Sequence, residues 1–359
     1  MTQRERELLK LIEADPMISQ QDIANRLGIT RSSVAVHISN LMKKGYIAGK
    51  GYVLRSASYA VVVGGITKDI GGRSLAPLVS RDSNPGKVRV SLGGVGRNIA
   101  HNMSLLGVDV RFLTAMGDDE FSHAVAASCG ELGIDISQAL QVPGAATSTY
   151  LFISGPEGDM ELALNDMEIF DRVTPAYLAS RHTLLDNAQL VVVDANSPAE
   201  SIAWLCANVK APIFADPVST VKGIKLKSVL GRIHTLKPNR LEAQLLSGVP
   251  ITGEESLEKA AAALLSTGLR RVFISLGGDG VYAADHEKHL HLPCVKGEMV
   301  NTTGCGDAFM AALVWAYLEG SGLQATAQAG LAASAIAMEG AETINPEMSA
   351  ENIRARAAL

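Results

Sequence analysis

The stretch TTGCGDAF, residues 302–309, places two glycines around one small residue and follows them at once with a carboxylate. Glycines allow a tight turn, and the unpaired N–H groups at the start of a helix attract anions. We therefore expect a phosphate-binding turn at Gly304, Cys305 and Gly306. The helix that follows is predicted from apolar residues at helical spacing, namely Ala308, Phe309, Ala312, Leu313 and Ala316.

Asp307 follows this turn directly and needs a task other than binding phosphate, because a carboxylate repels an anion. Accepting the proton of an attacking hydroxyl fits its place. In phosphoryl transfer the acceptor hydroxyl lies between the base and the migrating phosphoryl group. Taken alone, the same pattern is also typical of an ordinary capped turn with an aspartate in the first turn of its helix.

Two further glycine clusters lie at the ends of predicted elements. SLGGVGRNIAHNMSLLG, residues 91–107, is a glycine turn before an amphipathic helix, with Asn98 in the first turn. It does not follow the first predicted strand directly, as a dinucleotide-binding fingerprint should. SLGGDG, residues 275–280, ends a strand with flexible backbone that suits a nucleotide.

LKPNRLEAQLLSG, residues 236–248, ends a predicted strand and begins a helix. Asn239 and Glu242 are three residues apart, so they share one face of that helix. Their oxygens suit a hydrated Mg²⁺ and phosphates. The P-loop pattern G-x-x-x-x-G-K-[ST] does not occur in the sequence, which excludes a P-loop kinase.

From residue 59 onward, short β-branched apolar runs alternate with segments of helical periodicity. This alternation predicts an α/β fold with a mostly parallel sheet flanked by helices. Ligands in such folds bind beyond the carboxyl ends of the strands, where the polar motifs occur. Residues 67–91 and 147–166 do not fit the alternation, and we expect them to form a small β lid over the site.

Together these motifs resemble, in order and spacing, those of the ribokinase-like (PfkB) carbohydrate and nucleoside kinases, over residues 59–359. The resemblance implies a phosphotransferase that uses ATP and Mg²⁺. It implies that Asp307 deprotonates a primary hydroxyl while Gly304, Cys305 and Gly306 form the anion hole. Glu242 would serve the Mg²⁺ through water. The implied sugar-binding residues are Asp69, Gly93, Gly94 and Asn98, and the implied ATP-binding residues are Asn239, Glu242, Ser275, Gly277, Gly278, Gly280 and Thr303.

The glycine-turn motif begins with Asn301, where the family usually has an aspartate that belongs to a region holding a monovalent cation. The loss of that charge leaves activation by K⁺ open. The stretches DSNPGK, GGVGRNIAHN, LNDM, DPVS and IHTLKPNRLEA are similar to bacterial pseudouridine kinases in particular, which tend to carry Asn at this place. That similarity implies a ribonucleoside substrate, pseudouridine, phosphorylated at its 5′-hydroxyl. Candidate base-binding residues are Asn84, Asn165 and Lys222, for which ordinary loop hydrogen bonding is an equal alternative.

Residues 1–55 have a different character, with nine Lys/Arg against five Asp/Glu, or about +4 in a chain of net charge −5. Ser19 and Thr30 are expected to cap two helices that end near Gly28 and Gly45. Helix, glycine turn and helix predict a helix-turn-helix module. The residues that follow, 46–54, predict a β-hairpin as its wing.

This segment resembles the winged helix-turn-helix domains of bacterial transcription regulators, which implies DNA binding. The alternative is a three-helix docking module whose charges are merely solvated. A single such module binds weakly, so a homodimer is expected, and the lid of this kinase family often pairs two chains. The candidate DNA-binding residues are Arg31, Ser32, Ser33, His37, Lys43 and Lys44.

The composition of the 359 residues, 47% apolar and 19% charged, supports a large buried core and argues against disorder. No apolar run has membrane-spanning length and the four cysteines are scattered, so we expect a cytoplasmic protein without disulfides or a zinc site. His289 and His291 alternate on a predicted strand, which favours a solvent face. Two other functions stay open: a transcription regulator whose kinase fold senses a nucleoside, and a kinase for another nucleoside or a pentose.

Overall fold

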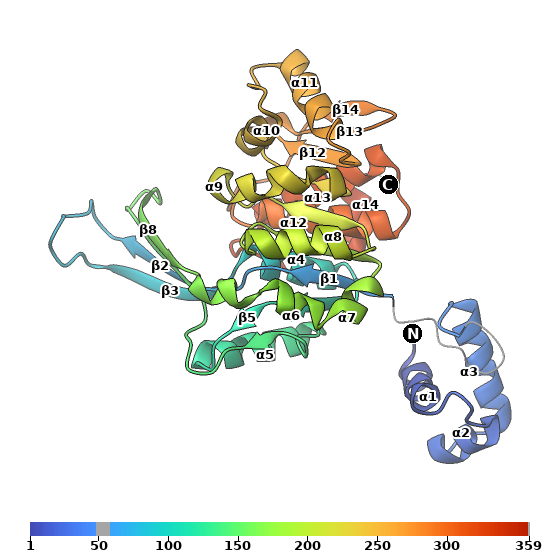
Figure 1. Cartoon of the computed structure of the whole chain (residues 1–359). Coiled ribbons are helices and arrows are strands. Elements are labelled where there is room, and N and C mark those ends of the chain that lie inside the picture. Colours follow the sequence, from blue (N-terminus) through green and yellow to red (C-terminus); the bar gives the residue numbers. More distant parts are fainter. Residues whose placement is uncertain (48–57, 358–359) are drawn as a thin grey trace. The chain divides into compact units, whose positions relative to one another are not determined.

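The computed structural model of the chain describes residues 1–47 and 58–357 (Figure 1). Contacts divide the chain into two compact units, Met1–Ser58 and Tyr59–Leu359.

The first unit is made of the three helices α1 (Gln3–Ala14), α2 (Gln20–Leu27) and α3 (Arg31–Lys43). Ser19 and Thr30 cap α2 and α3 as predicted, since each hydroxyl accepts a hydrogen bond from the N–H three residues on. Gly28 ends α2 in the left-handed conformation. The predicted wing hairpin lies mostly outside the described residues. The core consists of Leu8, Ile12, Ile18, Ile23, Ala24, Val34, Ile38, Leu41 and Ile47.

The second unit is built on an eight-stranded sheet in the order β14-β13-β12-β11-β10-β9-β1-β4. The six strands from β12 to β4 are parallel, and β13 pairs antiparallel with both β12 and β14. The mostly parallel sheet predicted from the sequence is therefore confirmed. The strands are β1 (Ala60–Val63), β4 (Val110–Leu113), β9 (Leu190–Asp194), β10 (Ile213–Asp216), β11 (Thr235–Leu236), β12 (Arg271–Ser275), β13 (Val281–Asp285) and β14 (His289–Leu292).

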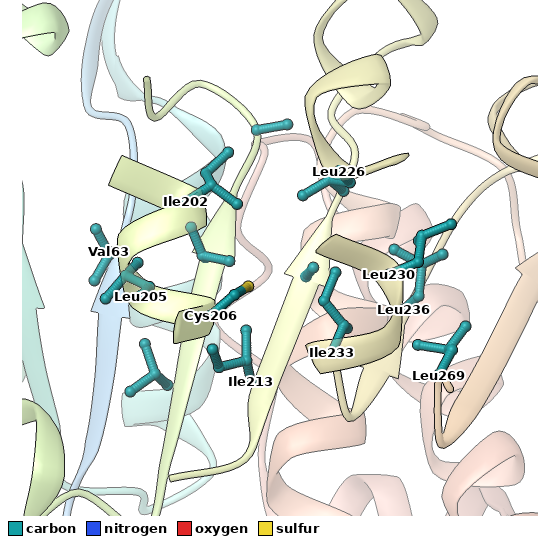
Figure 2. Close-up of a cluster of buried hydrophobic side chains, with 14 of the residues drawn as sticks. Val63, Ile202, Leu205, Cys206, Ile213, Leu226, Leu230, Ile233, Leu236 and Leu269 are labelled. Atoms are coloured by element: carbon teal, nitrogen blue, oxygen red, sulfur yellow. The ribbon is translucent and has the colours of Figure 1, made fainter. Parts of the chain in front are cut away.

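Helices cover both faces of this sheet, which is why β1 and β9 consist of β-branched runs with every residue buried. One face packs against α6 (Pro175–Ala179), α7 (His182–Asp186), α8 (Ala199–Asn208), α10 (Arg240–Ser247), α11 (Glu254–Leu265) and the 3-10 helix η2 (Ile224–Arg232). The other packs against α4 (Val95–Leu105), α5 (Glu120–Leu132), α12 (Cys305–Leu318), α13 (Leu323–Glu339) and α14 (Ala350–Ala357). Figure 2 shows part of the first layer, where Ile202 and Leu205 of α8 and Leu226 and Leu230 of η2 lie over the strand residues Val63, Ile213 and Leu236.

The two segments that break the alternation form a separate four-stranded sheet in the order β3-β2-β7-β8. In Figure 1 its strands project away from the helices of the large sheet. We call it the small sheet. Its strands are β2 (Thr67–Ser74), β3 (Gly86–Gly93), β7 (Thr149–Ser154) and β8 (Met160–Asp166); shorter elements elsewhere are β5 (Ala115–Met116), β6 (Leu140–Gln141), α9 (Thr220–Gly223), η1 (Glu168–Arg172) and η3 (Gly277–Asp279).

Candidate active site

Polar side chains gather at the carboxyl ends of the parallel strands, as expected for this fold class. Asp194 ends β9 and Asp216 ends β10, and the two residues are paired in register. The N-termini of α4 and α12 meet at the same place. There the Nδ2 of Asn98 donates a hydrogen bond of 2.9 Å to the Oδ2 of Asp307. Two motifs that are more than two hundred residues apart in sequence thus form one site.

The glycine turn before α12 is open toward this site. Gly304 is the N-cap of α12 and has a φ of 84°, and a Cβ at this position would collide with the backbone oxygen of Thr343. A Cβ on Gly306 would meet only the Nζ of Lys237, at 3.2 Å. The first N–H groups of α12 therefore border a space next to an ammonium group, an arrangement that suits an anion.

Sequence reasoning did not predict Lys237 as a site residue, nor Asp194 and Asp216. The side chain of Lys237 is buried, with 6% of the residue exposed, and its Nζ lies 3.2 Å from the Oδ2 of Asp216. Burial alone lowers the pKa of Lys237, but the carboxylates of Asp216, Glu242 and Asp307 outweigh it and hold the pKa above the ordinary value. A charged lysine thus faces the glycine turn. The signal in the sequence was a lysine directly after the apolar strand β11.

Asp307 lies in the first turn of α12 and keeps part of its surface accessible. Burial of the carboxyl group, with the nearby charge of Asp216, raises its pKa to about 7. The hydrogen bond from Asn98 and the charge of Lys237 act in the opposite direction and favour the ionised form. At neutral pH the group therefore exchanges a proton readily, as a general base requires.

Asp69 lies on β2, beside the glycine turn that precedes α4. Its carboxylate accepts a hydrogen bond of 2.6 Å from the hydroxyl of Thr67, and burial raises its pKa. A Cβ on Gly93 would collide with this carboxylate, so the absence of a side chain there makes room for it. Gly94 has a φ of 97°, and a Cβ on it would lie 2.5 Å from the backbone oxygen of Gly65. These two glycines therefore serve close packing of the turn.

The three candidate base-binding residues have different surroundings. Asn165 is exposed at the end of β8 and borders a shallow, open pocket of about 440 Å³. Lys222 donates to the Oδ1 of Asn196 at 2.6 Å, and burial lowers its pKa. Asn84 is bound within its own loop, where it bonds the backbone of Val79 and Asp82. These contacts use both the oxygen and the nitrogen of its amide, as the alternative of ordinary loop hydrogen bonding expects, and its role in base binding stays a prediction.

Asn239 and Glu242 have a structural role that the sequence analysis did not predict. The two residues form a capping box at the start of α10: the Oδ1 of Asn239 accepts from the N–H of Glu242, and the Oε2 of Glu242 accepts from the N–H of Asn239. This box explains the three-residue spacing without a ligand. One carboxylate oxygen of Glu242 stays outside the box, in a buried group whose pKa burial raises.

The 275–280 turn lies next to this helix start. The N–H of Ser275 donates to the carbonyl of Pro238 at 2.9 Å, and Arg240 forms an ion pair of 2.9 Å with Asp279. The glycines Gly277, Gly278 and Gly280 are thus held close to Asn239. His291 lies on β14 as predicted, and its ring nitrogens contact Glu254 and the carbonyl of Asp279.

The residues that open the α12 motif are engaged within their own loop. The Oδ1 of Asn301 accepts from the N–H of Thr303 at 2.9 Å, and its Nδ2 faces the carbonyl of Ala341 at 3.5 Å. Burial raises the pKa of the Cys305 thiol, which keeps this cysteine protonated. Cys305 therefore offers the site a backbone N–H rather than a nucleophile.

In the first unit, Arg31, Ser32 and Lys43 are exposed on α3, while Ser33 and His37 are partly exposed. Lys44 is different from these residues. Its Nζ bonds both oxygens of the buried Glu5 carboxylate, at 2.9 and 2.8 Å, and this contact holds the pKa of Glu5 at about 2. Lys44 therefore forms an ion pair within this unit, and its contact with a DNA backbone stays a prediction.

Two models of known protein families match the chain. The model of the pfkB family carbohydrate kinases matches residues 57–350, and a winged helix-turn-helix DNA-binding model matches residues 1–48. The chain therefore belongs to the pfkB family of carbohydrate kinases. Enzymes of this family transfer a phosphoryl group from ATP to a hydroxyl group.

Relatives match it over most of their length. A sugar kinase of Escherichia coli strain K12 named YeiI, which is described as uncharacterised, is 38% identical over 98% of both chains. The pseudouridine kinase of the same organism is 39% identical over 84% of this chain and 96% of its own. The ribokinase of Arabidopsis thaliana in complex with ribose and ATP has the same fold, with a TM-score of 0.73 at 20% identity over 84% of this chain and 99% of that chain.

The described residues, 1–47 and 58–357, contain no helix that is long and apolar enough to cross a membrane. Nor do they contain a group of three or more His, Cys, Asp or Glu side chains arranged to hold a metal ion.

Proposed function

We propose that the chain transfers a phosphoryl group from ATP to the 5′-hydroxyl of a ribonucleoside, pseudouridine, with Asp307 as the general base. The observation that supports this most is the set of groups around Asp307. A carboxyl group of pKa about 7 lies in the first turn of a helix that begins with an open glycine turn. A charged lysine borders the same turn.

Each group has a task in this proposal. Asp307 takes the proton of the 5′-hydroxyl. The backbone N–H groups of Gly304, Cys305 and Gly306, with the ammonium of Lys237, offset the charge of the migrating phosphoryl group. Asn98 holds the Asp307 carboxylate in place through the hydrogen bond between them.

The ATP side of the site is assigned to the neighbouring strand ends. The free oxygen of Glu242 serves Mg²⁺ through water, as the buried position of this carboxylate allows. Because the oxygen of Asn301 is already bound to Thr303, turnover is expected without a K⁺ requirement. The other ATP-binding residues in the proposal are Asn239, Ser275, Gly277, Gly278, Gly280 and Thr303.

A nucleoside is favoured as the substrate by the relative that is named as a pseudouridine kinase. Within this chain, Asp69 and the turn with Gly93 and Gly94 bind the ribose hydroxyls. Asn165 and Lys222 contribute polar contacts to the base.

The experiment is a measurement of ATP consumption with pseudouridine, uridine, inosine, adenosine and ribose. We expect turnover with pseudouridine and a loss of about 100- to 10,000-fold in kcat for Asp307→Asn, the range of general-base catalysis. Wild-type kcat/KM should rise with pH through about 7, as Asp307 loses its proton. If no compound is phosphorylated but one of them raises the melting temperature, the protein is a nucleoside-sensing regulator instead.

Thermal stability gives an independent check on Asp307. The folded protein holds this carboxyl proton more tightly than the unfolded chain does, because the pKa is raised from 3.8 to about 7. The wild type should therefore lose stability as pH rises between these two values. Asp307→Asn does not titrate, so it should melt at a higher temperature than the wild type at pH 8 and show a smaller difference at pH 5. Equal pH dependence would contradict the raised pKa.

The first unit is proposed to bind DNA through α3. The family match and the exposure of Arg31, Ser32 and Lys43 support this proposal. A mobility shift on DNA upstream of the gene for this chain should weaken with salt, and Lys43→Ala should reduce the salt dependence by about one counterion. Lys10→Ala on α1 is the matched control. Binding that is unchanged after removal of residues 1–55 would contradict the proposal.

A homodimer is proposed through the aliphatic face of the small sheet. Val88, Val90, Leu162 and Leu164 are 54 to 71% exposed and lie on one face of it. An aliphatic surface of this kind is typical of a protein interface. Leu164→Glu should convert the dimer to a monomer in light scattering; a wild type that is already monomeric would contradict this part of the proposal.

A further inference from the structure

The two faces of the small sheet carry different chemistry. Strand register pairs Asp69 with Ser91 and with Tyr150, and it pairs Tyr150 with Asn165. Because paired residues point to the same side of a sheet, these four side chains form one row on one face. We call this the inner face, since Asp69 lies against the glycine turn of the site.

Two aromatic rings lie on the inner face. Phe152 follows Tyr150 by two residues, so both rings lie on the same side of β7, with their centroids 5.7 Å apart. Gly71 is paired with Phe152, and a Cβ on it would come within 2.5 Å of the ring. The absence of a side chain at Gly71 thus lets the Phe152 ring lie across the sheet beside the row that contains Asp69.

These rings are not core residues. Tyr150 and Phe152 are both partly exposed, and neither belongs to the buried clusters of the unit. The opposite face is aliphatic, with Ile70, Val90 and Leu164 at the positions that alternate with the row. Aliphatic side chains suit contact with protein, whereas exposed rings beside hydrogen-bonding groups suit a planar heterocycle.

We propose that Tyr150 and Phe152 form a stacking platform for the nucleobase of the substrate, and that this platform makes the site selective for a nucleoside over a free pentose. The inference rests on the proposed nucleoside substrate and adds the residues that select it. Asp69 holds the sugar, Asn165 in the same row bonds the edge of the base, and the rings of Tyr150 and Phe152 cover its face.

Titration calorimetry with pseudouridine and with ribose tests the platform in the Asp307→Asn background, which removes turnover from the measurement. Tyr150→Leu and Phe152→Leu should each weaken pseudouridine binding by about 10- to 100-fold, the size of one base–aromatic contact. Both should leave ribose binding unchanged. Tyr150→Phe keeps the ring and should bind pseudouridine nearly as the parent does. Tyr46→Leu, the same change at an exposed tyrosine of the first unit, is the control.

Different failures have different meanings. Equal weakening of pseudouridine and ribose by Tyr150→Leu would show a general structural role and overturn the platform, as would unchanged pseudouridine binding. If Tyr150→Leu does not fold, Phe152→Leu decides by the same criteria. Selective binding in a wild-type protein that does not phosphorylate the nucleoside would overturn the kinase proposal and leave the platform intact. Tight binding of ribose alone would overturn both.

Discussion

The helices α4 and α12 begin at the same site. Each follows a glycine with positive φ, but their first turns carry different functional groups. Gly94 at the start of α4 and Gly304 at the start of α12 both have positive φ, 97° and 84°. The first turn of α4 then presents the neutral amide of Asn98, and that of α12 presents the carboxyl group of Asp307. A helix N-terminus ordinarily favours the ionised carboxylate. Since the pKa of Asp307 is nevertheless raised, burial and the charge of Asp216 outweigh the helix.

The two glycine turns also differ in the space around them. The turn before α4 is closed on protein, because Cβ atoms on Gly94 and Gly96 would meet the backbone of Gly65 and Gly64 at 2.5 and 2.6 Å. At the turn before α12, the nearest group to a Cβ on Gly306 is the movable end of Lys237. The glycines of α4 therefore serve packing. At α12, Gly304 also packs closely, against Thr343, and it is Gly306 that leaves room for a ligand. The comparison separates the groups that build the site from the groups that react in it.

The largest effect beyond Asp307 itself is expected at Lys237, the charge that distinguishes the α12 turn. Lys237→Met should lower kcat by about 100- to 1,000-fold, the cost of losing one donor to the transition state. It should also destabilise the protein by about 3–5 kcal/mol, because Asp216 would be left buried without its partner. Urea unfolding and steady-state kinetics measure the two effects separately.

The double variant Asp216→Asn with Lys237→Met is the control for this prediction. It removes the unpaired charge, so it should recover much of the lost stability. Activity should stay low, since the ammonium group is still absent from the turn. Recovery of kcat together with stability would show that Lys237 acts only through the fold.

A smaller effect is expected from Gly304→Ala. An alanine at positive φ costs about 1–2 kcal/mol, and at this position it also collides with Thr343. The displaced turn should lower kcat by up to about 100-fold, as small misplacements at a reacting centre do.

Gly107→Ala is matched to Gly304→Ala, because Gly107 has a φ of 81° and its Cβ would meet nothing within 4 Å. It should lower the melting temperature through backbone strain alone and leave kcat unchanged. Equal kinetic effects of the two substitutions would remove the α12 turn from the catalytic site.

The sequence was sufficient for features that depend on neighbouring residues. The caps Ser19 and Thr30 and the buried strands β1 and β9 follow from local patterns of a few residues. The same local information was ambiguous at Asn239, because a three-residue spacing to a glutamate fits a capping box as well as a ligand pair.

Features that depend on contacts between residues distant in sequence could not be predicted from local patterns. Lys237 acquires its role only because β10 and β11 end where α12 begins, which brings Asp216 and Gly306 to its ammonium group. Tyr150 joins the row with Asp69 only through the register of β7 on β2. Neither contact can be predicted from residue spacing within a single helix or strand.

The smallest expected effect is a shift in pH dependence at Asn98, the group by which α4 acts on α12. The hydrogen bond from Asn98 favours the ionised form of Asp307, so its removal in Asn98→Ala should raise the pKa of Asp307 further above its ordinary value. The rise of kcat/KM with pH should move to higher pH, with a loss of about 10-fold at pH 7 that becomes smaller at pH 9. Ser104→Ala, at the far end of α4, should leave the pH profile unchanged. A pH-independent loss in Asn98→Ala would mean that Asn98 contributes by binding substrate rather than by tuning the base.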